Sequence, residues 1–473
     1  MIKLSLEKIA EIVNGKLVNS SASKTIAAVA IDSNKVTPGA LFVAIEGARQ
    51  DGHTFIEEAF ANGAIVALVS KPIADFPHIL VTEKSQAPED FSQPTIWALA
   101  KLAKYVHQNL PQLITVAITG SSGKTTTKDL VLQLGDLLGS TIATKGSANN
   151  EIGMPLTVLE CNDDTRLLVL EMGARHSGNI AYLTNIAKPN FSIITHIGTA
   201  HLEIFGSQEK IIDTKAEIIE NLSASDWAII NLDDNNSKKV INKTLASLAT
   251  FAVDNDADLI AKSIITNDQG NPKFELEFKG QSSEVKLNLV GNHNVYNAMA
   301  AALPFLLSGV SLEKVAERLN SSKALSKWRM ESTQLKNNIL LINDAYNANL
   351  ESMSAALQAL AQIGNQRRKI AILGEMKELG EKSQSFHFAI GELSAKMKID
   401  HLLVVGGGAQ QIIEGARADE SWSGEATLHE NNQTLFNHAK ELLSENDVVL
   451  IKASRSVGLE VVAKELIEIN GEA

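Results

Sequence analysis

Short runs of apolar and β-branched residues recur along this sequence, and segments with helical periodicity lie between many of them. In the middle of the chain these runs cover residues 114–119, 167–170, 193–195 and 227–230. Runs that are apolar throughout, rather than alternating, are typical of strands buried on both faces of a parallel sheet. The pattern therefore predicts a central α/β domain with a mostly parallel sheet covered by helices.

Two further blocks flank this region. Residues 1 to about 84 mix turns with apolar runs at 41–45 and 64–69. From about residue 326 onward, runs at 339–342, 370–373, 401–405 and 448–451 are each followed by a helical stretch. The sequence thus predicts three α/β domains: a small one at 1–84, a central one at 85–325 and a Rossmann-like one at 326–473. A polar stretch at 83–95, with two prolines and no periodicity, is predicted to be a linker.

Composition excludes several classes of protein. The 473 residues contain one cysteine, Cys161, so no internal disulfide framework can form, and a small apolar filler is the simplest role for it. No signal peptide and no apolar run of about 18 residues is found, so we expect a cytoplasmic chain without a membrane span. A net charge of −12 disfavours nucleic-acid binding but not the binding of a nucleotide at a local site.

The strongest local feature is Thr119-Gly-Ser-Ser-Gly-Lys-Thr-Thr-Thr127, which follows an apolar strand and precedes a helical segment running to about residue 138. This is the context of a phosphate-binding loop, in which glycines let the backbone approach the phosphates of ATP. Lys124 would contact the β- and γ-phosphates, and the hydroxyl of Thr125 would bind Mg²⁺. The loop residues assigned to ATP are Gly120, Ser121, Ser122, Gly123, Lys124, Thr125 and Thr126.

This loop departs from the strict Walker pattern, which has a glycine five residues before Gly123, where this chain has Ile118. The alternative is a Gly/Ser turn ahead of an ordinary helix. A Gly-Lys-Thr-Thr sequence directly after a buried strand favours the phosphate loop over that turn.

With this shortened loop the chain resembles the Mur ligase family, and further matches extend over nearly its whole length. They are Glu171-Met-Gly173, Thr195-His-Ile-Gly-Thr-Ala-His-Leu-Glu-Ile-Phe-Gly-Ser207, Lys215-Ala-Glu217, Gly291-Asn-His-Asn-Val-Tyr-Asn-Ala-Met-Ala300, Trp328-Arg-Met330 and Asn343-Asp-Ala-Tyr-Asn-Ala-Asn349. The resemblance implies an ATP-dependent amide ligase of cell-wall precursor synthesis, which activates a carboxylate as an acyl phosphate.

Details within the family favour the activity that joins D-alanyl-D-alanine to UDP-N-acetylmuramoyl-tripeptide. The stretches that carry this likeness are Gly146-Ser-Ala-Asn-Asn-Glu-Ile-Gly-Met-Pro155, Asp344-Ala-Tyr-Asn-Ala-Asn349 and Gly374-Glu-Met-Lys-Glu-Leu-Gly380. The Asp-Asn-Pro-Arg motif of the ligase that adds a diamino acid is absent. So is the Gly-Ala-His-Asn-Pro-like stretch of folylpolyglutamate synthase.

The resemblance extends to the N-terminal block, which in the family holds the uridine nucleotide. It matches at Asp32-Ser33, Pro38-Gly39, Leu41-Phe42, Gly47, Asp51-Gly-His53 and Gly63-Ala64, so Ser33 is expected at the substrate. Asn149 and Asn150 are expected there too, with a simple turn as the alternative. Departures from the family pattern occur at Asn34, His196, Leu350 and Ala453, none of which is a proposed metal ligand.

Two Mg²⁺ sites are implied by the resemblance. Glu171, which closes the strand at 167–170, would join Thr125 at the first, although a solvated strand-end acid is the alternative. His201 and Lys215 would belong to the second. A lysine of ordinary pKa is a cation and cannot bind Mg²⁺, and in the family the matching lysine is carbamylated, which makes it an anionic oxygen ligand. The alternatives are a structural histidine and a surface lysine on a helix at 209–221.

The remaining ATP contacts are expected from two domains. Asn292, Asn294 and Asn297 are assigned to the adenine, since amides both donate and accept hydrogen bonds; N-capping of a helix is the alternative. By resemblance, Arg329 lies near the phosphates and Asp344 on the ribose hydroxyls. Closure of the C-terminal domain would then complete the site and exclude water from the acyl phosphate.

Three rival interpretations stay open at this point. The first is another Mur ligase with a different amino donor, and the second is a P-loop regulatory ATPase without ligation chemistry. The third is an inactive sugar-nucleotide-binding module, which the presence of Lys124, Glu171, His201 and Lys215 disfavours. In every case a monomer is expected.

Overall fold

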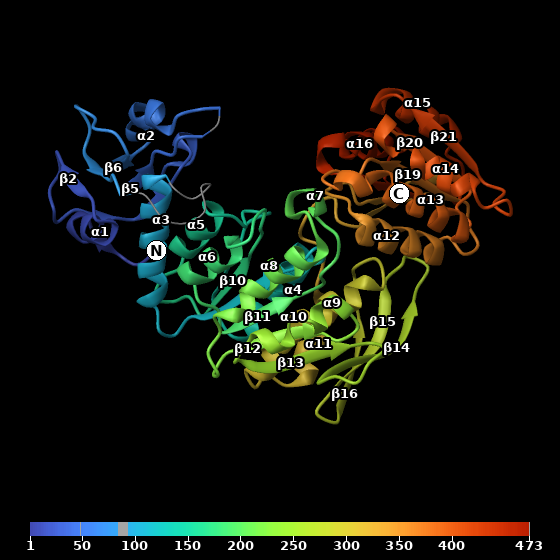
Figure 1. The fold of residues 1–473 in the computed structure, drawn as a ribbon, viewed down its shortest axis with the longest axis horizontal. Helices are drawn as coiled ribbons and strands as arrows, with labels where there is room; N and C mark the ends of the chain where they lie inside the picture. Colours follow the sequence, from blue (N-terminus) through green and yellow to red (C-terminus); the bar gives the residue numbers. More distant parts are fainter. Residues whose placement is uncertain (48, 84–92, 473) are drawn as a thin grey trace.

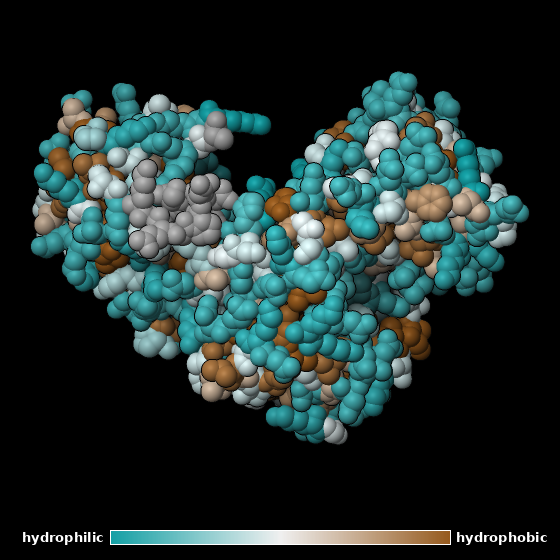
Figure 2. All heavy atoms as spheres, viewed as in Figure 1, coloured by the Kyte–Doolittle hydropathy of each residue, from teal (hydrophilic) through white to brown (hydrophobic). Residues whose placement is uncertain are grey.

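A computed structural model of the chain describes residues 1–47, 49–83 and 93–472. Three α/β domains are each built around a sheet of their own (Figure 1). In that view the N-terminal domain lies on the left, the C-terminal domain on the right, and the central domain between and below them. Figure 2 shows a wide notch between the two outer lobes and a mainly hydrophilic face over which apolar residues are scattered.

The N-terminal domain contains a five-stranded sheet of order β2-β7-β6-β5-β4 and a short pair, β1 and β3. Its elements are β1 (Leu4–Ser5), α1 (Leu6–Val13), β2 (Lys16–Val18), β3 (Thr25–Ile26), β4 (Ala28–Ala30), β5 (Ala40–Val43), α2 (Ile56–Ala61), β6 (Ala64–Val69) and β7 (His78–Leu80). The runs at 41–45 and 64–69 are thus strands β5 and β6. Most of the predicted linker, and the domain boundary after residue 84, lie outside the described residues.

The central domain is built on a nine-stranded sheet of order β16-β15-β14-β13-β12-β11-β8-β10-β9. Its strands are β8 (Ile114–Thr119), β9 (Thr141–Ala143), β10 (Leu167–Glu171), β11 (Phe191–Ile194), β12 (Trp227–Asn231), β13 (Ser247–Ala252), β14 (Leu259–Thr266), β15 (Pro272–Phe278) and β16 (Gln281–Lys286). Its helices are α3 (Pro94–Gln108), α4 (Lys124–Leu134), α5 (Gly153–Leu159), α6 (Asn179–Ile186), α7 (Leu202–Phe205), α8 (Gln208–Glu220), α9 (Asn235–Lys238), α10 (His293–Leu307) and α11 (Leu312–Ser321).

Strands β8 to β14 pair in parallel, as the apolar runs predict. Successive apolar side chains of β8, β10, β11 and β12 enter opposite cores. In β8, for example, Val116 and Ile118 join one core cluster while Ala117 joins the other. Strands β15 and β16 extend the sheet in antiparallel fashion. The sheet is therefore mixed rather than parallel throughout.

The C-terminal domain contains a six-stranded sheet of order β17-β18-β22-β19-β20-β21, parallel except for edge strand β17. Its elements are β17 (Glu331–Gln334), β18 (Leu340–Asn343), α12 (Leu350–Ile363), β19 (Lys369–Gly374), α13 (Ser383–Lys396), β20 (His401–Val405), α14 (Gln411–Arg417), β21 (Glu425–His429), α15 (Asn432–Leu442), β22 (Val448–Lys452) and α16 (Leu459–Asn470). Helices cover both faces, since alternate residues of these strands enter two separate cores. The Rossmann-like α/β prediction is confirmed.

Helices α13 and α14 approach so closely that their glycines touch the opposite backbone. A Cβ atom on Gly391 would lie 2.0 Å from the carbonyl oxygen of Ile412. We expect Gly391→Ala to destabilise the C-terminal domain by about 1–3 kcal/mol, because the helices would have to move apart. Urea unfolding followed by circular dichroism measures this. Gly407→Ala is the control, since a Cβ there meets nothing within 4 Å; equal midpoints for the two variants would contradict the prediction.

Candidate active site

A cavity of about 1570 Å³ lies between the central and C-terminal domains and is lined by residues of both. It opens at the carboxyl ends of the central strands. Strand β8 is flanked by β10 on one side and β11 on the other, and the chain runs outward from β8 in both directions. Such a reversal of strand order leaves a crevice at the carboxyl edge of a sheet, where ligands of α/β proteins bind.

The predicted phosphate loop follows β8 at this crevice, and the segment after β11 holds it in shape. Gly120 has φ +148°, and a Cβ atom there would lie 2.1 Å from Thr195 Oγ1, so only glycine fits. The hydroxyl of Thr195 donates to the carbonyl of Ser122 at 2.6 Å, and the amide of Ser121 donates to the carbonyl of His196 at 2.7 Å. The start of α4 therefore faces the cavity, as an anion site requires.

Lys124 is the first residue of α4, and its ammonium group donates to the carbonyl of Gly120 at 2.7 Å. Burial lowers the pKa of Lys124 below its ordinary value, although the charge of Glu171 opposes this shift. The lysine thus lies folded over the loop that is predicted to hold the phosphates, in a partly desolvated position where an added negative charge would be favourable.

Thr125 and Glu171 meet as the sequence predicts. The Thr125 hydroxyl donates to Glu171 Oε2 at 2.8 Å, and the side-chain amide of Asn149 donates to Oε1 at 2.7 Å. Glu171 is 1% exposed at the end of β10, so it is not a solvated strand-end acid. A hydroxyl and a carboxylate oxygen side by side on a phosphate loop match the hard oxygen ligands that Mg²⁺ prefers, so this donor set fits a magnesium ion.

Lys215 lies on the buried face of α8 and lines the same cavity, with an exposed fraction of 3%. It is therefore not a surface lysine. Burial, assisted by the charge of Lys124, lowers the pKa of Lys215 to about 7. As an ammonium group it does not fit a metal site. As a neutral amine it can react with CO₂, and the resulting carbamate does fit.

His201 follows β11 and lines the cavity near Lys215. It has a φ of 62°, and its Nδ1 is hydrogen-bonded to the carboxylate of Glu378, a residue of the C-terminal domain. Burial lowers the pKa of His201, which favours the neutral imidazole that a metal ligand needs. Nothing in the sequence marks Glu378 as a partner of this histidine.

The three asparagines assigned to adenine lie at the start of α10, and none of them caps this helix with its side chain. The side-chain amide of Asn294 donates to the backbone carbonyl of Val290 at 2.8 Å, and the side-chain amide of Asn297 donates to Asn294 Oδ1 at 2.8 Å. Asn292 accepts from the hydroxyl of Thr266 at 2.8 Å. Capping is therefore wrong as an alternative. Asn294 and Asn297 line the cavity, whereas Asn292 is not among its lining residues, and the adenine role of all three stays a prediction.

Arg329 and Asp344 lie on the wall contributed by the C-terminal domain. The guanidinium carbon of Arg329 is 4.0 Å from the centre of the Tyr346 ring, and its buried Nε has no hydrogen-bond partner in the described part of the chain. Asp344 accepts from the ammonium of Lys452 at 2.6 Å. Tyr346 and Lys452 were not predicted as site residues, although Tyr346 lies inside the stretch 343–349 that matches the family.

The residues assigned to the UDP-linked substrate lie in two places, with Asn149 and Asn150 at the cavity and Ser33 away from it. Asn150 lines the cavity, and its Oδ1 accepts from the amide of Gly153 at 2.9 Å in the turn that opens α5. Ser33 lies in the N-terminal domain, where its hydroxyl donates to Glu58 at 2.7 Å, and it is not among the described residues that line the cavity. The substrate roles of both stay predictions.

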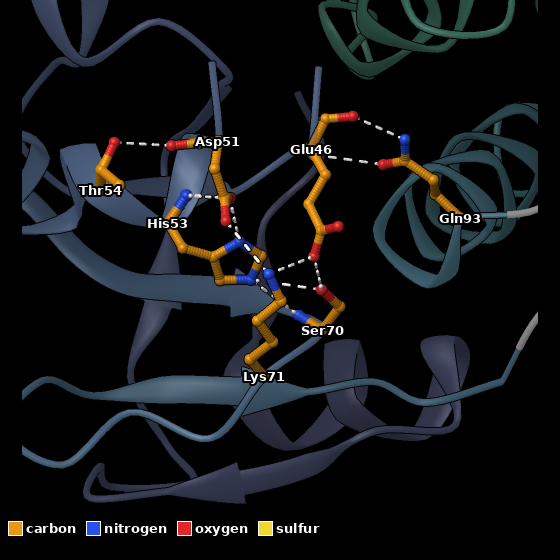
Figure 3. A network of polar contacts seen from close by, with 7 residues as sticks. All are labelled: Glu46, Asp51, His53, Thr54, Ser70, Lys71 and Gln93. Atoms are coloured by element: carbon orange, nitrogen blue, oxygen red, sulfur yellow. Dashed lines mark hydrogen bonds and ion pairs between the residues drawn. The ribbon is translucent and has the colours of Figure 1, made fainter. Parts of the chain in front are cut away.

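A second polar cluster lies in the N-terminal domain, where Glu46, Asp51 and His53 place ligand atoms within 4.8 Å of one another (Figure 3). The ring of His53 is already used on both sides, since Nε2 accepts from the amide of Ser70 at 3.1 Å and Nδ1 donates to Asp51 at 2.6 Å. Lys71 adds a positive charge between the two acids. The hydrogen-bonding and charged groups of this cluster are therefore paired with one another. It also ties the domain to the start of α3, because Gln93 bonds both backbone groups of Glu46.

Sequence comparison identifies the class of protein that this fold and this cavity define. Three family models match consecutive parts of the chain: "Mur ligase family, catalytic domain" at 25–103, "Mur ligase middle domain" at 118–304 and "Mur ligase, glutamate ligase domain" at 328–455. The chain belongs to the Mur ligase family, and the resemblance seen in its motifs is confirmed.

Within that family, the chain is 39% identical to UDP-N-acetylmuramoyl-tripeptide–D-alanyl-D-alanine ligase of Mycobacterium tuberculosis, over 99% of this chain and 98% of that protein. The crystal structure of MurF from Acinetobacter baumannii is 31% identical, with a TM-score of 0.89 over 98% of this chain and 99% of that one. MurF ligase from Thermotoga maritima, solved in complex with ADP, is 30% identical, with a TM-score of 0.80 over 93% and 98%. The three-domain fold is thereby confirmed.

In the part of the chain that the structure describes, no helix combines the length and the apolar character needed to cross a membrane.

Proposed function

We propose that this chain is an ATP-dependent amide ligase that joins D-alanyl-D-alanine to UDP-N-acetylmuramoyl-tripeptide, forming the pentapeptide precursor of peptidoglycan, ADP and phosphate. The observation that carries the proposal is the similarity over 99% of the chain to a ligase of that name. A phosphate loop alone fits many ATPases. The match through all three domains includes the parts that would bind both other substrates.

In this proposal ATP lies in the cavity between the central and C-terminal domains. The loop 120–123 and the start of α4 bind its phosphates, and Lys124 turns from Gly120 toward the β- and γ-phosphates. Arg329 faces the phosphates from the opposite wall, Asp344 binds the ribose, and the segment 292–297 faces the adenine. The ADP complex of the relative from Thermotoga maritima supports nucleotide binding.

Thr125 and Glu171 would hold one Mg²⁺, and His201 with carbamylated Lys215 a second. Bound Mg²⁺ would neutralise charge on the phosphoryl oxygens during transfer. For the first site, the 2.8 Å contact between the Thr125 hydroxyl and the Glu171 carboxylate supports the assignment. For the second, the support is the burial of Lys215, which gives it a reactive neutral amine.

The reaction has two balanced steps. A carboxylate oxygen of the tripeptide attacks the γ-phosphorus, the bond to the β-phosphate oxygen breaks, and ADP leaves an acyl phosphate behind. The neutral amine of D-alanyl-D-alanine then attacks the acyl carbon, phosphate leaves with the bonding electrons, and the proton lost from the nitrogen ends on the released phosphate. Lys124 and the amides of the loop stabilise the negative charge of both steps, while the C-terminal domain covers the cavity and excludes water.

The UDP-linked substrate is assigned to the N-terminal domain at Ser33 and, at its peptide end, to Asn149 and Asn150. We place the reaction in the cytoplasm and expect the protein to act as a monomer. A single buried cysteine, Cys161, whose pKa burial raises to about 12, is compatible with a reducing compartment.

Carbamylation of Lys215 is expected to become slower as the pH falls. Only the neutral amine reacts with CO₂. Since the pKa of Lys215 is lowered to about 7, the reactive form is present above about pH 7 and is lost below it. After CO₂ is removed, activity is expected to recover when dissolved CO₂ is restored; at a constant concentration of dissolved CO₂, recovery slows about tenfold for each unit below that pH. Rates of recovery measured across this range check it; recovery that is independent of pH would contradict it.

Phosphate release with different amino donors tests the function itself. With ATP, Mg²⁺ and UDP-N-acetylmuramoyl-tripeptide present, D-alanyl-D-alanine is expected to stimulate release, whereas meso-diaminopimelate and L-lysine are not. Stimulation by one of the latter would instead assign another Mur ligase activity. Release that needs no amino donor would favour a regulatory ATPase.

A further inference from the structure

The segment that carries His201 is held from the opposite domain. Glu378, in the loop after β19 of the C-terminal domain, accepts the Nδ1 hydrogen of His201. The carbonyl oxygen of Glu378 also accepts from the amide of Glu203 at 3.1 Å. Figure 1 shows helix α7, which contains Glu203, lying against the C-terminal domain. One residue of that domain thus contacts both a side chain and the backbone of the segment.

A second carboxylate of the C-terminal domain holds the other end of the same segment. Glu351, the second residue of α12, accepts from the amide of Thr199 at 2.7 Å. It lies so close that a Cβ atom on Gly198 would be 2.4 Å from its carboxyl carbon. Residues 198–203 are therefore fixed between Glu351 and Glu378, and both contacts exist only when the two domains lie against each other.

The contact with Glu378 selects which nitrogen of a neutral His201 ring carries the hydrogen. In a neutral imidazole, a carboxylate that accepts the hydrogen on Nδ1 leaves the lone pair on Nε2, and Nε2 of His201 has no hydrogen-bond partner within residues 1–47, 49–83 and 93–472. Histidines that bind metals commonly donate their other N–H to a carboxylate in this way. Both His201 and Glu378 also have φ near +60°, a conformation that residues other than glycine rarely adopt. The contact between their side chains therefore depends on an unusual backbone conformation at both residues.

We propose that Glu378 is a positioning residue which orients His201 for the second metal site, so that this site is complete only when the C-terminal domain is closed on the central domain. The inference rests on the proposed function, of which the second metal site is a part. Closure of the C-terminal domain then does more than exclude water, because it also orients the metal ligand His201. Transfer of phosphate in an open enzyme, where the acyl phosphate would be hydrolysed, is thereby disfavoured.

Binding of Mn²⁺ to the full chain, followed by electron paramagnetic resonance with a non-hydrolysable ATP analogue and bicarbonate present, tests the inference. The wild type is expected to bind two ions. Glu378→Ala should weaken the second about 10–100-fold, whereas Glu378→Gln, whose amide oxygen still accepts the N–H, should stay close to the wild type. Glu381→Ala is the matched control, because Glu381 is exposed in the same loop, and it should leave binding unchanged.

The same measurement in a His201→Ala background separates positioning from a merely structural role. If Glu378 acts through His201, adding Glu378→Ala there causes no further loss. Unchanged binding of the second ion by Glu378→Ala, or an equal loss in Glu378→Gln, overturns the inference and leaves the proposed function standing. A wild type that binds only one ion overturns both the inference and the second metal site. Thermal unfolding of each variant identifies any loss that comes from misfolding.

Discussion

Replacing Lys124 by alanine is expected to lower kcat/KM about 10²–10³-fold, the range observed when one preorganised donor to a developing negative charge is removed. The ammonium group of the half-buried Lys124 lies on the phosphate loop, and its one hydrogen bond in the described part of the chain is to the carbonyl of Gly120. It is therefore free to turn to the phosphates, in surroundings where charges are only weakly screened. Steady-state phosphate release with all three substrates measures the loss.

Lys145→Ala is the control for this experiment. Lys145 is an exposed lysine of the same domain whose ion pair with Glu160 lies at the surface, so its removal should leave kcat/KM nearly unchanged. Wild-type kcat/KM in Lys124→Ala would contradict the assignment of residues 120–125 to the phosphates of ATP.

Lys215→Ala is expected to lower activity by at least about 100-fold, because even changes behind a metal ligand cost 10–100-fold and this residue is assigned as a ligand itself. Alanine leaves room at the cavity wall for a small carboxylate. Acetate added to the assay should therefore restore part of the activity, by supplying the oxygen ligands that the carbamate provides. Initial rates with increasing acetate, at fixed ionic strength, check this expectation.

The matched control is Lys210→Ala, an exposed lysine one and a half turns earlier on α8. It should keep full activity and show no response to acetate. Full activity of untreated Lys215→Ala would remove Lys215 from the mechanism. Stimulation of both variants to the same degree would show that acetate acts elsewhere.

Much of the architecture follows from the sequence, because strands buried on both faces must be apolar throughout. The runs at 64–69 and 114–119 have the same limits as β6 and β8, and the run at 401–405 those of β20. The antiparallel extension formed by β15 and β16 was not predicted. In β15 apolar and polar residues alternate, with Phe274, Leu276 and Phe278 buried, and β16 is almost wholly polar. These two outermost strands on one side of the sheet lack the continuous apolar run that distinguishes the central ones.

The candidate site was predictable where its chemistry is local in sequence. The phosphate loop, with Lys124 and Thr125, is one continuous segment, and Glu171 is marked by the end of a buried strand. Contacts between domains were not predictable. His201 meets Glu378 across 177 positions, and Tyr346 meets Ser147 across 199. An apolar pattern determines which face of an element is buried, but it contains no information on which distant loop lies against it.

The measurement that tests the central claim most directly is the mass of the product formed from ATP, Mg²⁺, UDP-N-acetylmuramoyl-tripeptide and D-alanyl-D-alanine. We predict a single new species heavier than the UDP-linked substrate by D-alanyl-D-alanine less one water, with one ADP and one phosphate released for each molecule formed. An unchanged UDP-linked substrate, whether ATP is left intact or hydrolysed to ADP, would contradict the account.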